Sequence, residues 1–176
     1  MPTTINRPGA EEYPSTYQGY LDYLPEGEVL YLLEKQSADL RHMFKNISEE
    51  RAEEAYAVGK WTMKELLQHL IDAERIFGYR ALCFSRAEQA DLPGWDENRY
   101  VYNSLANIRP LVQLLDEYEL ARRSNLAMFR SFTAEMLSSY GVANGNSMTV
   151  RGLIHVLAAH ELHHIKILEE RYLKRK

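Results

Sequence analysis

The sequence predicts an all-α protein: a four-helix bundle with an irregular N-terminal arm over residues 1–27 and one helical domain over residues 28–176. Two observations predict this fold. Apolar residues recur at helical spacing in four segments of bundle length, and no segment shows a convincing strand pattern. A chain of 176 residues is long enough to bury the core of one such domain without disulfides.

The arm and the first helix are separated by a turn. Four prolines fall within residues 1–27, so this segment is expected to be largely irregular. After Gly27 the apolar residues follow helical spacing, which predicts a first helix that ends near residues 46–48. Its apolar positions are Val29, Leu30, Leu33, Leu40, Met43, Phe44 and Ile47.

The second helix has a clear start, because Thr62 and Glu65 form a T-x-x-E capping box. Its apolar arc fades around residues 85–89, and residues 90–98 contain turn formers without a clean period. The third helix begins around residues 107–110, with Pro110 in its first turn. The connection between the second and third helices is therefore long enough to be a crossover rather than a tight turn.

The fourth helix is expected from about Thr149 to Leu173, after a cluster of turn formers at residues 141–147. Apolar residues one or two turns apart form its stripe, which predicts that one face of this helix is buried in the bundle. The members of this stripe are Val150, Leu153, Leu157, Ile167 and Leu168.

Composition excludes several classes of protein. The net charge of -4, from 21 basic and 25 acidic residues, argues against a nucleic-acid partner, which would require clustered positive charge. The single cysteine, Cys83, excludes a disulfide framework and a cysteine-based zinc module. No apolar run resembles a signal peptide or a membrane span, so we expect no membrane partner and a cytoplasmic location.

The histidines are the unusual feature, because four of the six fall within residues 155–164. Helical phasing places His160 and His164 in the middle of the apolar stripe, one turn apart, where both imidazoles can reach one metal ion. A third histidine from a facing helix would complete an open site, and His69 lies at the border of the apolar arc of the second helix. Spacing alone leaves the third ligand open, and it leaves ordinary buried histidines with polar partners as the alternative.

Charged residues near these histidines could have several roles. The E-x-x-H pair formed by Glu161 and His164 is typical of di-iron sites, but only one such pair is present, so a two-metal carboxylate site is disfavoured. Asp72, Glu74 and Glu161 are candidates for acid–base work or for orienting a histidine, and each also fits a polar border. Arg122 and Arg123 are interpreted as a solvated pair, with anchoring of a substrate anion as the alternative.

Two segments resemble signatures of the DinB/YfiT-like superfamily. Residues 56–75 contain G-K-W-T followed by H-L-I-D-A-E, which resembles the second-helix signature. Residues 149–164 end in H-E-L-H-H, which resembles the last-helix signature. The region between is also similar at residues 92–94 and 120–122, and the resemblance covers roughly residues 25–173.

The resemblance implies a bundle that holds one divalent metal through His69, His160 and His164, without His163. Zinc or nickel is the metal we expect first, with iron or manganese as alternatives. Family members often form homodimers, and several resemble transferases that use a low-molecular-weight thiol, whereas others are described as hydrolases. We therefore expect a metal-dependent enzyme with a small-molecule substrate, either a thiol S-transferase or a hydrolase. A non-catalytic metal-binding or dimerisation module is the remaining alternative.

Overall fold

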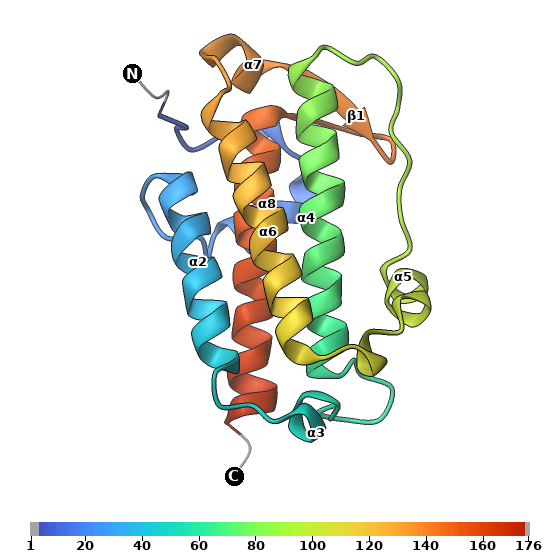
Figure 1. Cartoon of the computed structure of the whole chain (residues 1–176). Helices are drawn as coiled ribbons and strands as arrows, with labels where there is room; N and C mark the ends of the chain where they lie inside the picture. Colours follow the sequence, from blue (N-terminus) through green and yellow to red (C-terminus); the bar gives the residue numbers. More distant parts are fainter. Residues whose placement is uncertain (1–3, 175–176) are drawn as a thin grey trace.

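The structure is a computed structural model that describes residues 4–174, and it confirms the four-helix bundle (Figure 1). The two ends of the predicted arm and domain, residues 1–3 and 175–176, lie outside the described residues. The four long helices are those that the apolar spacing predicts: α2 (Val29–Phe44), α4 (Met63–Ser85), α6 (Leu111–Arg130) and α8 (Val150–Ile167), the last continued by a π-helical segment (Leu168–Leu173).

Side chains cap three of these helices where the sequence changes from loop to helix. Thr62 Oγ1 accepts a hydrogen bond from the Glu65 amide (3.1 Å), and Glu65 accepts one from the Thr62 amide (2.8 Å), as the capping box predicts. Glu28 caps α2 and Thr149 caps α8 in the same manner. The predicted starts therefore match because a specific side chain satisfies free amides at each one.

The direction of the helices explains the long connection. In Figure 1, α2 and α8 run one way along the bundle, and α4 and α6 run the other way. Two consecutive parallel helices require a crossover, and residues 86–110 return along the outside of α4 through α5 (Glu97–Ser104) and a 3-10 turn (Ala106–Ile108). The predicted crossover is thus confirmed, although α5 within it was not predicted.

The arm combines irregular chain with short ordered turns. It contains two 3-10 turns (Ala10–Glu12 and Ser15–Tyr17) and a one-turn helix, α1 (Gln18–Leu21). Glu12 accepts hydrogen bonds from Thr149 (2.9 Å) and Arg151 (2.7 Å) at the start of α8, which fixes the arm to the bundle. Most of the described arm is irregular, as predicted, and short helical turns together with a partly buried ion pair order it against the bundle.

A small β-hairpin corrects the expectation that the chain has no strands. Strands β1 (Tyr140–Ala143) and β2 (Asn146–Thr149) pair antiparallel. The turn between them is Asn144–Gly145, and both residues have positive φ (53° and 69°), as a two-residue hairpin turn requires. Strands of four residues are too short to show alternation, although the Asn-Gly pair is a signal for a hairpin.

Two short helices complete the described chain, α3 (Glu49–Ala52) and α7 (Ala134–Ser138). No helix within residues 4–174 has the length and apolar character that crossing a membrane would demand. The core divides into two clusters along the bundle. On α8, the first cluster reaches Ala159 and the second begins at Ile165. The segment that carries His160 and His164 lies between them, so polar rings are partly buried where the two apolar clusters meet.

Candidate metal centre

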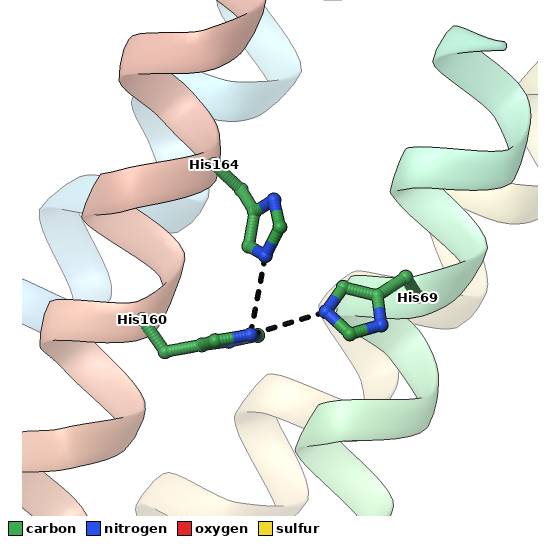
Figure 2. Close-up of side chains that lie close together, drawn as sticks. All are labelled: His69, His160 and His164. Atoms are coloured by element: carbon green, nitrogen blue, oxygen red, sulfur yellow. Dashed lines mark hydrogen bonds between the residues drawn. The ribbon is translucent and has the colours of Figure 1, made fainter. Parts of the chain in front are cut away.

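Three histidines from two helices meet inside the bundle. His69 extends from α4, and His160 and His164 extend from α8 (Figure 2). The Nε2 atom of His160 lies 3.1 Å from His69 Nε2 and 3.2 Å from His164 Nε2. One ring nitrogen from each residue lies within 4.8 Å of the other two. The structure thus brings together the three residues that the resemblance implies as ligands.

Aromatic neighbours hold the rings in these orientations. His69 lies between Trp61 (ring centroids 4.9 Å apart) and Trp95, which stacks on it at 5.3 Å with an interplanar angle of 7°. The ring of Phe77 stacks on His160 at 6.1 Å. Neither the tryptophans nor Phe77 were predicted to lie at this site, although Trp61 directly precedes the Thr62 cap and belongs to the G-K-W-T signature.

Burial keeps the three imidazoles neutral. It lowers the pKa of His69 to about 4 and that of His160 to about 3, because water no longer solvates the charged form. The pKa of His164 is also lowered, first by burial and then by the facing rings of His160 and His69. At neutral pH each ring therefore has one nitrogen with a free lone pair, which is the form that binds metals.

The residues fit a metal ion better than they fit one another. An imidazole nitrogen carries either one proton or one lone pair, so His160 Nε2 cannot make good hydrogen bonds to both neighbours. The Nδ1 atoms of all three histidines also lack a partner within residues 4–174. Tetrahedral nitrogen ligands about 2.0–2.1 Å from zinc lie about 3.3 Å apart. Two of the three separations, 3.1 and 3.2 Å, are close to this value, and all three nitrogens lie within 4.8 Å of one another.

A cavity of about 420 Å³ opens beside the three histidines, so a bound ion would remain accessible to small molecules. Seven aromatic side chains contribute to its walls. Among the described residues, Glu97 is the one carboxylate in the lining, and it is exposed. The aromatic lining consists of Tyr17, Tyr20, Tyr56, Trp61, Phe77, Trp95 and Tyr172.

The three candidate carboxylates lie elsewhere. Glu74 and Glu161 are each 1% exposed and accept hydrogen bonds from Arg122, and Glu161 also accepts one from Tyr118. Asp72 accepts a hydrogen bond from a glutamine one turn earlier (2.9 Å), and burial raises its pKa. None of the three lines the cavity beside the histidines.

Arg122 corrects the interpretation of residues 122–123 as a solvated pair. Its side chain is 1% exposed and makes ion pairs with a carboxylate on α4 and another on α8, whereas Arg123 is exposed. The guanidinium also donates to the Leu33 carbonyl (2.6 Å). A helical count would have revealed this, because Arg122 lies one turn from Tyr118 and from Leu126 on the buried face of α6.

The other histidines occupy different positions. His163 packs edge-on against Tyr20 (4.9 Å) and lies next to the ring of His164 (5.1 Å), at the border of the cavity. His155 is buried, and its Nδ1 lies 2.9 Å from the Arg151 carbonyl. The helical turn to which His155 belongs therefore satisfies this ring without a metal.

Comparison with known proteins agrees with this architecture. A solved structure from Bacillus subtilis, YfiT, has a TM-score of 0.72 and 17% sequence identity, and the match covers 84% of this chain and 90% of YfiT. YfiT is described as "a probable metal-dependent hydrolase with an unusual four-helix bundle topology". No curated protein sequence matches the chain. The sequence profile of the DinB superfamily matches residues 32–168, and the chain belongs to this superfamily.

Proposed function

We propose that the chain is a divalent-metal-dependent enzyme that activates a low-molecular-weight thiol for transfer to a small electrophilic substrate. The observation that carries the proposal is the convergence of three neutral imidazole nitrogens, from His69, His160 and His164, beside an open cavity. Three protein ligands leave at least one position free, which is typical of catalytic rather than structural metal sites. Zinc or nickel is the ion that we propose first.

The ion would supply Lewis-acid chemistry, lowering the pKa of a thiol or water that reaches its open position. The chain itself orients the ligands through the two tryptophans that flank His69. Its aromatic walls limit access of water and provide apolar surface for a substrate. The chain can thus orient the ligands and line the cavity without rearranging its side-chain contacts.

The lining of the cavity favours a thiol over water as the nucleophile. A free thiol has a pKa of about 8.5, so a modest shift yields the thiolate at neutral pH, whereas water starts at about 15.7. Hydrolytic sites usually add a carboxylate base, but Glu74 and Glu161 lie outside the cavity and pair with Arg122, and the one carboxylate in the described lining, Glu97, is exposed. Cys83 does not line the cavity, so the sulfur has to come from a small molecule.

Hydrolysis is the second candidate, and the description of YfiT as a metal-dependent hydrolase favours it. In this version Glu97, which lines the cavity, is the carboxylate available as a base. The same cavity and the same three histidines would serve both reactions. The two candidates therefore differ in the nucleophile and in the need for Glu97.

One experiment separates the two candidates. Zinc- or nickel-loaded protein is incubated with an electrophilic acceptor, with and without a small thiol, and with carboxylic ester substrates. The thiol proposal predicts turnover that requires the thiol, is lost in His160→Ala and is retained in Glu97→Gln. Turnover of esters without thiol, lost in Glu97→Gln, would instead establish the hydrolase.

A further inference from the structure

A second cavity of about 660 Å³ lies next to the metal cavity. Four residues line both cavities: Tyr20, Tyr56, His163 and Ile167. The second cavity extends from these shared residues along the last turns of α8 and the π-helical segment, with α1 on its other side. The two cavities therefore adjoin along this shared wall.

The second cavity has positive character. Lys166 and Arg171 line it, together with one carboxylate, Glu170. Within residues 4–174, no carboxylate lies within 4 Å of the Lys166 or Arg171 nitrogens, although Glu170 is one turn from Lys166. Both cations are thus available to an external anion.

Aromatic contacts position the cation that lies nearer to the histidines. The Lys166 ammonium lies 4.1 Å from the centre of the ring of Tyr23, which also lines the second cavity. Tyr20 packs against His163, and Tyr56 packs edge-on against Tyr172 (5.0 Å). The shared wall is therefore built from packed rings, which suits a ligand that is apolar between two polar ends.

We propose that the second cavity binds the carboxylate end of the thiol that the three histidines activate. This inference rests on the proposed function and names its cofactor class: a small thiol with a carboxylate at the far end. Seven residues separate His164 from Arg171, a rise of roughly 10 Å along the helix. A thiol of this class spans that length, with its sulfur at the histidines and its carboxylate at Lys166 and Arg171.

Calorimetry on the zinc-loaded protein compares 6-mercaptohexanoate with 6-mercaptohexanol, which differ only in the terminal group. We expect the carboxylate to bind about fivefold more tightly, the contribution of one or two solvent-accessible charge-assisted contacts. Lys166→Gln combined with Arg171→Gln removes this preference while binding of 6-mercaptohexanol stays unchanged. Arg123→Gln, which removes an exposed charge on α6, keeps the preference.

A second measurement separates failure of the cavity from failure of the thiol proposal. Metal-free protein is titrated with hexanoate and with hexanol, and amide NMR signals of residues 163–171 are followed. Shifts caused by hexanoate but not by hexanol support the anion site even if neither thiol binds the loaded protein. Equal affinities of the two thiols, or no hexanoate shift at these residues, would overturn the inference.

Discussion

Replacing Arg122 with methionine removes the cation that joins α4 to α8 through α6. The Arg122 side chain pairs with Glu74 and Glu161, and all three side chains are 1% exposed. Glu161 follows the candidate ligand His160 directly, so this cluster ties together the two helices that bear the three histidines. The substitution keeps the length of the side chain while leaving two carboxylates without their partner.

The expected loss of stability follows from the burial of these carboxylates. Removing one member of a buried ion pair costs about 3–5 kcal/mol, because the remaining charge is neither solvated nor compensated. Two carboxylates depend on one guanidinium here, so we expect a loss toward the upper end, which lowers Tm by roughly 10–20 °C in a domain of this size. Burial already raises the pKa of Glu161, although Arg122 lowers it, so protonation of this group limits the loss.

Guanidinium unfolding of the metal-free protein measures this loss. Arg123→Met is the matched control, because it removes the same charge from an exposed neighbour and is expected to cost less than about 0.5 kcal/mol. Adding Glu74→Gln and Glu161→Gln to Arg122→Met restores most of the stability, since neutral amides replace the stranded charges. A loss below about 1 kcal/mol in Arg122→Met, or no recovery in the triple variant, would refute this reasoning.

Three further predictions concern the histidines and the helix packing. Burial lowers the pKa of His69 from 6.5 to about 4, so the unfolded chain binds more protons than the folded chain below pH 6.5. Urea titrations of the metal-free protein should therefore show the free energy of unfolding falling as the pH drops toward 4, by about 1 kcal/mol per pH unit for each such histidine. A flat profile would contradict this prediction. Cobalt(II) should quench most of the tryptophan emission, because Trp61 and Trp95 are the chain's two tryptophans and both contact His69; unquenched emission from the loaded protein would place the ion elsewhere. Gly78→Ala should lower the free energy of unfolding, measured by thermal unfolding, by about 1–3 kcal/mol, because the added Cβ would lie 2.2 Å from Asn125 Oδ1 and the Asn125 side chain is fixed by hydrogen bonds to α4. An unchanged stability would mean that this side chain can move aside.

The sequence predicted those parts of the molecule that depend on a single helix. Apolar spacing and the Thr62 capping box fix α4, and the i,i+4 spacing of His160 and His164 places both rings on one buried face. The third member of the group could not be assigned from spacing, because the approach of His69 depends on how α4 packs against α8. Only the family signature supplied that relation.

The predictions that were wrong concern residues whose environment depends on several helices. Arg122 was interpreted as solvated because charged pairs usually are, but its burial depends on carboxylates contributed by α4 and α8. The β1–β2 hairpin was missed because its four-residue strands carry no readable alternation. The second cavity depends on where α1 lies against α8, a contact that no local pattern encodes.

Metal content of tag-free protein tests the central claim most directly. The protein is purified without chelators, and bound metals are quantified by elemental analysis in the wild type, His160→Ala and His163→Ala. We predict about one equivalent of a single divalent transition metal in the wild type and in His163→Ala, and its loss in His160→Ala, because only the latter removes a nitrogen from the group of three. Less than about a tenth of an equivalent in the wild type, or unchanged metal content in His160→Ala, would contradict the assignment of the three histidines as a metal site.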